Sequence, residues 1–124
     1  MKGILLDTIN QKVQVVDCES SLDAWYKLLN CDLIEMPEIK IGGKYFTIIC
    51  DEEGLLKSDP IISGMGTDIR LVGNLLIFNT DHENCDVTDL TNEDISLIRD
   101  NLGVMLMIDN VTMTPQIILK DLEW

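Results

Sequence analysis

The chain has 124 residues, of which 22 are acidic and nine are basic, so its formal net charge at pH 7 is −13. A field of this sign repels nucleic acid and anionic membranes and attracts basic protein surfaces, so direct binding of DNA or RNA is not expected. Hydrophobic residues make up 46% of the composition, as in folded chains, and the length predicts a single domain over residues 1–124.

Apolar runs and cysteine usage predict a soluble protein of the cytoplasm. The longest uninterrupted apolar run, Val104–Ile108, is far shorter than the roughly 20 residues that a membrane helix needs. The four cysteines are widely scattered and follow no signal peptide, so we expect reduced thiols. We expect no membrane contact and no cofactor.

The first elements form a predicted hairpin and helix. Lys2–Leu6 and Lys12–Val16 have the pattern of two short strands joined by a loop. Ser20 and Asp23 have the spacing of a helix cap, which predicts a helix to about Asn30. Its apolar stripe, which we expect in the core, consists of Leu22, Trp25, Tyr26 and Leu29.

A second hairpin is the clearest turn signal in the chain. Leu33–Ile41 contains Pro37, which favours a strand at the edge of a sheet. Gly42 and Gly43 then form a two-residue turn into the apolar strand Lys44–Cys50. A further turn is expected at residues 51–54.

The middle of the chain is expected to contain a loop, a strand and a connector. Ser58–Asp68 has the glycines and small polar residues of a loop. Ile69–Phe78 reads as one central strand with a bulge at Gly73, and Asp81–Asp89 as an acidic connector.

The last predicted helix begins with a capping box. Thr91 and Asp94 have the required spacing, and apolar residues recur at helical intervals until Gly103. Val104–Ile108 and Gln116–Leu122 then form either a hairpin or a strand and a docking tail. We expect an α+β fold with a mostly antiparallel sheet of about five or six strands and two helices packed on one face.

No set of residues amounts to a catalytic or metal site. His82 and Cys85 form a single H-x-x-C pair, without the further close ligands that structural zinc requires. Residues 51–53 supply neighbouring carboxylates, which in a turn are usually solvated. Gly64–Thr67 lacks the spacing and the lysine of a phosphate-binding loop. We therefore expect no enzyme and no metal ion.

The acidity is concentrated in residues 80–101, where seven acids stand against one base, Arg99. One interpretation is solubility together with favourable charges at a helix N-terminus. The other is a surface for a basic protein, in the extreme case a mimic of nucleic acid. The residues of this candidate surface are Asp81, Glu83, Asp86, Asp89, Glu93, Asp94 and Asp100.

Two arginines provide an alternative binding site. Arg70 or Arg99 could grip a phosphate group of a small ligand at a subunit interface, even in an acidic protein. The apolar end of the chain, which includes Leu122 and Trp124, would either complete the chain's own fold or pair with a second copy in a homo-oligomer.

Three segments resemble a known family. Ile49–Lys57, Gly73–Ile77 and Leu90–Ile95 together resemble DUF3846, a family of domains of unknown function in small acidic proteins of phages, prophages and conjugative elements of Gram-positive bacteria. The resemblance covers about residues 2–102, which would be a family-like core, and leaves 103–124 as an extra C-terminal segment. It implies no catalytic residues, and a place in the cytoplasm of a bacterial host.

Charge and resemblance together predict a non-catalytic accessory protein of a phage or mobile element. It would bind a basic protein partner through its acidic surface, as an inhibitor of a host defence or nucleic-acid enzyme. The alternative prediction is an oligomeric protein that binds a nucleotide signal.

Overall fold

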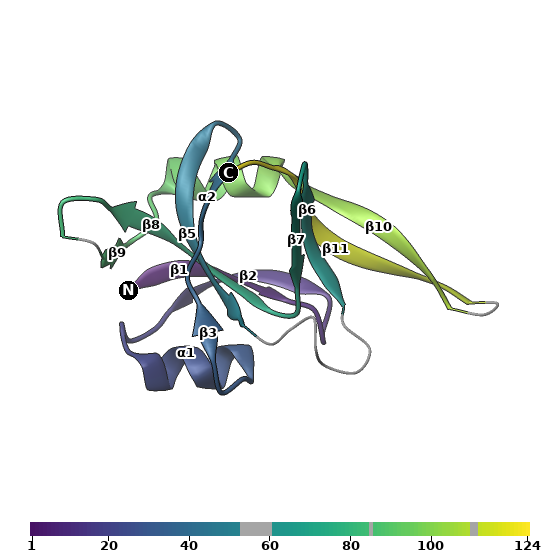
Figure 1. Cartoon of the computed structure of the whole chain (residues 1–124), viewed down its shortest axis with the longest axis horizontal. Coiled ribbons are helices and arrows are strands. Elements are labelled where there is room, and N and C mark those ends of the chain that lie inside the picture. Colours follow the sequence, from purple (N-terminus) through teal and green to yellow (C-terminus); the bar gives the residue numbers. More distant parts are fainter. Residues whose placement is uncertain (53–60, 85, 110–111) are drawn as a thin grey trace.

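The computed structural model describes residues 1–52, 61–84, 86–109 and 112–124. Its fold is α+β and mostly antiparallel, as predicted, but the strands form two sheets instead of one sheet of five or six strands (Figure 1). The second half of the predicted turn at residues 51–54 lies outside the described residues, as does the start of the predicted loop Ser58–Asp68.

The larger sheet has seven strands, and all of its pairings are antiparallel. Its main order is β2-β1-β8-β5-β3, with β4 also paired to β5 and β9 also paired to β8. Both predicted hairpins are present, β1 with β2 and β4 with β5. The strands are β1 (Lys2–Asp7), β2 (Lys12–Asp17), β3 (Ile34–Glu35), β4 (Glu38–Ile41), β5 (Lys44–Asp51), β8 (Leu75–Asp81) and β9 (Asp86–Thr88).

The smaller sheet has four strands in the order β10-β11-β6-β7, and β11 runs parallel to β6. The prediction of a loop over Ser58–Asp68 was wrong where β6 forms. The predicted strand Ile69–Phe78 is two strands, because Gly73 adopts a positive φ of 75° and the chain passes from one sheet to the other. The strands are β6 (Ile62–Gly66), β7 (Ile69–Val72), β10 (Leu102–Asp109) and β11 (Thr112–Leu122).

Both predicted helices form. α1 (Leu22–Leu29) begins one residue later than expected, because the side chain of Ser21 and not of Ser20 accepts the amide of Ala24. α2 (Asn92–Asp100) has the predicted capping box, in which Thr91 and Asp94 bond each other's backbone amides. The stripe of α1 is only partly buried, since Leu22 is 52% exposed.

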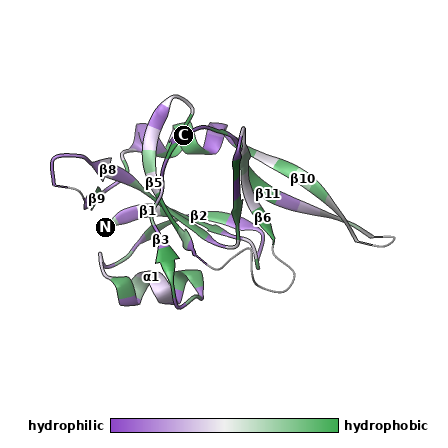
Figure 2. Ribbon diagram, viewed as in Figure 1, coloured by the Kyte–Doolittle hydropathy of each residue, from purple (hydrophilic) through white to green (hydrophobic). Residues whose placement is uncertain are grey.

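The helices lie on opposite faces of the seven-stranded sheet, so their predicted placement on one face was wrong. Alternate residues of β8 divide between two cores. Leu75 and Ile77 pack in the first core with α2 and the inner face of the smaller sheet. Leu76 and Phe78 pack in the second core with Trp25 and Leu29 of α1. Figure 2 shows hydrophobic residues along these central strands.

The C-terminal segment forms a hairpin and completes the chain's own fold. β10 pairs with β11 from Leu102↔Leu119 to Asp109↔Thr112, and β11 pairs with β6. Beyond β11, Lys40 and Glu123 exchange backbone hydrogen bonds of 2.7 and 3.2 Å, which connects the two sheets. Among the described helices, neither is both long and apolar enough to span a bilayer.

Candidate functional site

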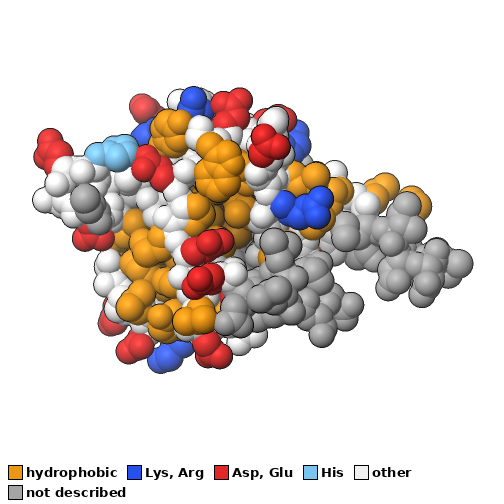
Figure 3. All heavy atoms as spheres, viewed as in Figure 1, with side chains coloured by type: hydrophobic (Ala, Val, Ile, Leu, Met, Phe, Trp, Pro, Cys, Tyr) orange, Lys and Arg blue, Asp and Glu red, His pale blue; other side chains and the backbone are white. Residues whose placement is uncertain are grey.

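The predicted acidic stretch does not form one surface. Asp81, Glu83 and Asp86 surround the turn between β8 and β9, whereas Glu93 and Asp100 lie near the two ends of α2. On the face drawn in Figure 3, acidic side chains are separated by hydrophobic and uncharged surface and form no continuous ridge. The described residues on this face therefore form no row of charges that imitates a nucleic-acid backbone.

The turn after β8 holds one carboxylate in a fixed orientation. Asp81 Oδ1 accepts the backbone amides of Glu83 and Asn84 at 3.1 and 3.3 Å, and Asp81 Oδ2 accepts Asn84 Nδ2 at 2.7 Å. These hydrogen bonds, that of the Asn84 side chain foremost, lower the pKa of Asp81. The Asp81 carboxylate is thus ionised at neutral pH, and its position is set by the hydrogen bonds of the turn.

A groove of about 390 Å³ lies beside this turn. We call it the acidic groove; its lining consists of Met36, Glu38, Thr47, Thr80, Asp81, His82, Asp86 and Val87. Three of these side chains are carboxylates, and Met36 and Val87 provide an apolar wall. The groove therefore combines negative charge with a surface on which a hydrocarbon chain can pack.

Strand register explains how distant residues reach the groove. Glu38 is the Cα partner of Thr47, and Thr80 is the partner of Val87, so each pair shares a face. Thr47 also faces Phe78, two residues before Thr80. The four residues of these two pairs therefore extend the sheet face that carries α1 and the second core. The hydroxyls of Thr47 and Thr80 are 2.8 Å apart and hydrogen-bonded.

His82, whose sequence pairing with Cys85 predicted no site, contacts a different residue in the structure. His82 Nε2 lies 2.5 Å from Glu38 Oε1, and the two side chains are 69% and 40% exposed. Cys85 lies outside the described residues. Within the described part of the chain, no three His, Cys, Asp or Glu side chains are placed to hold a metal ion.

Asp94 has a structural role at the start of α2. Its side chain is 5% exposed and accepts Lys44 Nζ at 2.6 Å, Asn79 Nδ2 at 3.1 Å and the Thr91 amide at 3.0 Å. Burial by itself would raise the pKa of Asp94, but the hydrogen bonds from Lys44 and Thr91 outweigh burial and lower it. A partner cannot reach this carboxylate, so Asp94 is not part of a binding surface.

The remaining predicted acids are exposed but scattered. Asp89 Oδ1 accepts the backbone amide of Lys2 at 2.6 Å, which fixes the start of β1. Glu93 and Asp100 line a shallow depression along α2 together with Leu97. Glu83 lies in the turn beside the acidic groove and is not part of its lining.

The two predicted arginines are not brought together. Arg99 lies in the last turn of α2, and Arg70 lies on β7 of the smaller sheet. Both are exposed. That Arg70 or Arg99 grips a phosphate at a subunit interface stays a prediction.

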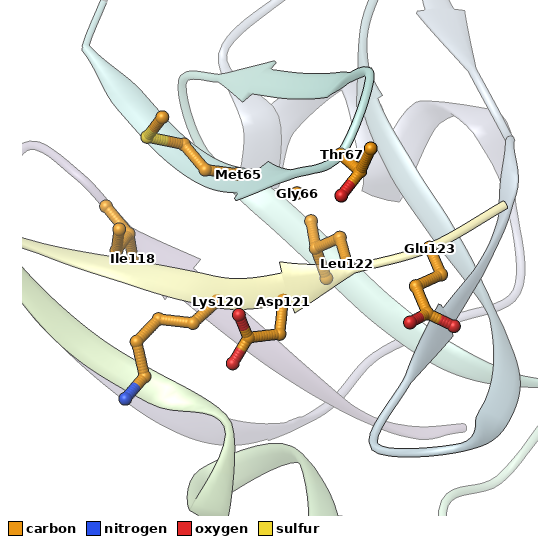
Figure 4. Close-up of a pocket in the computed structure, with 8 residues that line it drawn as sticks. All are labelled: Met65, Gly66, Thr67, Ile118, Lys120, Asp121, Leu122 and Glu123. Carbon is orange, nitrogen blue, oxygen red and sulfur yellow. The ribbon is translucent and has the colours of Figure 1, made fainter.

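A second hollow, of about 440 Å³, lies between β6 and the end of the chain from Ile118 to Glu123 (Figure 4). Arg70 is the cross-strand partner of Met65, which lines this hollow together with Lys120, Asp121 and Glu123. Asp121 has a positive φ of 55° where the register of β11 with β6 shifts, so Lys120 and Asp121 project on the same side of β11 in Figure 4. Lys120 thus shares the hollow with two acidic residues, Asp121 and Glu123.

Glu38 is the acidic residue of the groove that the sequence did not predict. It lies 43 positions before Asp81, and nothing in its local pattern distinguishes it from other exposed strand residues. Only the pairing of β4 with β5 brings it to the groove.

Comparison with known proteins gives one result. The family model described as Domain of unknown function (DUF3846) matches residues 1–103, which include β1 to α2 and the first residues of β10. No curated protein and no solved structure matches the chain. Because the match covers well over half of its residues, the chain belongs to the DUF3846 family.

Proposed function

We propose that this protein is a non-catalytic accessory protein that binds a basic protein partner through the acidic groove. The observation that carries the proposal is the convergence of Glu38, Asp81 and Asp86 on one groove with an apolar wall. A lysine or arginine side chain of the partner fits this chemistry, because its charged head would meet carboxylates while its hydrocarbon stem packs on Met36 and Val87.

The fixed turn supports binding at this place. Asp81 is held by hydrogen bonds to Glu83 and Asn84, so little conformational freedom of this carboxylate would be lost on binding. Asp86 is the Cα partner of Asp81 across the β8–β9 pair, which keeps a second negative charge close by. The overall charge of −13 would accelerate the encounter with a basic surface.

The class of partner follows from the same charge argument. Enzymes that act on nucleic acids have basic grooves, and a protein that occupies such a groove inhibits the enzyme. We therefore propose a nucleic-acid enzyme of the host, such as a defence nuclease, as the target, and a phage or mobile element in a bacterial cytoplasm as the setting. This setting rests on the sequence resemblance and not on the geometry.

The test compares charge changes inside and outside the groove. Wild-type protein is used to capture basic partners from host lysate, and the affinity for the purified partner is then measured for E38Q/D86N and for the control E93Q/D100N. Both variants remove two exposed negative charges. We expect the groove variant to weaken binding by about tenfold or more, and the control by much less. Equal effects of the two variants, or binding that is insensitive to salt, would overturn the proposal.

The second candidate function is the binding of an anionic ligand, such as a nucleotide signal, by an oligomer. Two basic residues favour it. Arg70 is the cross-strand partner of Met65, which lines the second hollow, and Lys120 lines the same hollow. Asp121 and Glu123 in the same hollow oppose it, which is why we place it second. A rise in melting temperature with one member of a nucleotide panel, lost in R70A and kept in R99A, would support it. A flat response across the panel would exclude this candidate.

A further inference from the structure

The hairpin of β10 and β11 projects from the body of the molecule as an apolar finger (Figure 1). At its base, Leu102 and Leu119 are cross-strand partners, and Leu119 is fully buried in the first core. Further out, Val104 and Leu106 lie on the same face as Leu102, because side chains alternate along a strand. The core-facing side of the smaller sheet thus continues along the finger.

Among the described residues, none covers this outer part of the face. Val104 is 68% exposed, Leu106 is 55% exposed and Met113 of β11 is 59% exposed. Leu106 is the cross-strand partner of Pro115, so the apolar surface spans both strands. Figure 2 shows hydrophobic residues on β10 beyond the body of the molecule. Solvent-exposed side chains of this kind on one continuous face are typical of an interaction surface.

β10 is also an edge strand without the usual protection. It is the outermost strand of the order β10-β11-β6-β7, and it contains no proline and no charged residue before Asp109. The edge strand β2 of the larger sheet, by contrast, carries Lys12 and Asp17. Proteins normally place charges, prolines or bulges on edges that must not pair, so the open edge of β10 is suited to pair with another strand.

The charge distribution identifies the partner strand. From Leu102 to Leu119 the sole charged residue is Asp109, in a chain with a net charge of −13. Two copies of this chain repel each other over most of their surface, and the repulsion is smallest where the fingers meet. A basic partner would gain nothing electrostatic from this uncharged strand. The surface therefore fits a second copy of the chain better than it fits a basic protein.

We propose that β10 pairs with β10 of a second copy, antiparallel and about a two-fold axis, to form a homodimer. Such an axis joins the two four-stranded sheets edge to edge and keeps their apolar faces on the same side. With the axis near Leu106, the Leu106 side chains of the two copies lie side by side, Val104 of each copy lies on the same apolar face, and the open backbone groups of both edges are paired. The acidic groove, on the other sheet, stays accessible in the dimer.

The test is the oligomeric state of the full chain, measured by light scattering and sedimentation up to about 100 µM, where even weak dimers are populated. We expect a dimer for wild type and a monomer for L106E, in which two like charges face each other across the axis. L22E is the matched control, because Leu22 is similarly exposed, at 52%, but lies on α1. We expect L22E to stay dimeric.

A charge-swap experiment guards against variants that merely misfold. L106K is expected to be monomeric like L106E, and a mixture of L106E and L106K is expected to form a heterodimer, because opposite charges then meet at the axis. Unchanged circular dichroism of each variant verifies its fold. A wild type that is monomeric throughout the range, or single variants that remain dimeric, would overturn the proposal. So would a mixture that does not associate.

Discussion

Lys44 Nζ lies 2.6 Å from Asp94 Oδ1 and joins the start of β5 to the start of α2. Asp94 is also the third residue of α2 and completes its capping box with Thr91, so one buried carboxylate bonds a strand and a helix at once. α2 covers the face of the seven-stranded sheet on which the first core forms, with Ile95 and Ile98 buried against it. The pair therefore fixes how the helix sits on its sheet.

Replacing Asp94 is expected to destabilise the fold. D94A removes the bond from the Thr91 amide that completes the capping box and the charged hydrogen bond from Lys44, which together are expected to lower the free energy of unfolding by about 2–3 kcal/mol. Urea unfolding followed by circular dichroism measures this difference. The control is E93A, which removes an exposed carboxylate from the same turn and should cost less than about 0.5 kcal/mol. Similar losses for both variants would contradict the role of Asp94.

Acid is expected to weaken the same interaction. The folded-state pKa of Asp94 is below its ordinary value of 3.8, so the unfolded chain binds more protons at this position as the pH falls. The stabilisation from Asp94 is complete above the ordinary value and is lost as the pH decreases through the lower, folded-state value. The free energy of unfolding, measured from neutral pH down to the acid range, should decrease less steeply in D94N than in wild type. Parallel curves would argue against this linkage.

The capping box shows what could be predicted from sequence. Thr91 and Asp94 are three residues apart, and this local spacing led correctly to α2. The turn at Gly42 and Gly43 likewise led to the hairpin of β4 and β5. Such features depend on neighbours in the chain, because caps and tight turns are closed by hydrogen bonds over a few residues.

The division into two sheets could not be predicted in the same way. Ile69–Phe78 is apolar nearly throughout, and its break depends on contacts from far along the chain. The side-chain carbonyl of Asn74 accepts the backbone amide and the hydroxyl of Thr8, at 2.9 and 2.8 Å. The sheet face on which each helix packs could not be predicted either. An amphipathic stripe shows that one side of a helix is buried, but it does not show which face of the sheet buries it. The acidic groove depends on such long-range pairing too.

Close packing of β6 against β11 leads to a prediction about Gly66. A Cβ atom at this position would overlap the backbone of Leu122, including its carbonyl carbon at 2.6 Å. Since backbone cannot move aside as a side chain can, G66A is expected to cost about 3 kcal/mol of stability. Thermal and urea unfolding measure the loss.

The matched control for this substitution is G103A on β10. The three atoms nearest to a Cβ there all belong to the flexible side chain of Lys120, which can shift. G103A should therefore change the stability by no more than about 1 kcal/mol, and in either direction. If G66A were as well tolerated as G103A, the tight parallel pairing of β6 and β11 would be refuted.

Gln11 connects the first hairpin to the base of the finger. Its Oε1 accepts the backbone amide of Ile117 at 2.8 Å, and its Nε2 donates to the carbonyl of Thr8 at 2.7 Å and to Gln116 Oε1. Q11A removes these bonds, so we expect a loss of about 1–2 kcal/mol in stability and faster hydrogen exchange of the Ile117 amide. Q14A, a substitution of the same type on β2, should leave that amide unchanged. Equal exchange rates in Q11A and Q14A would show that the finger is anchored by its strand pairing alone.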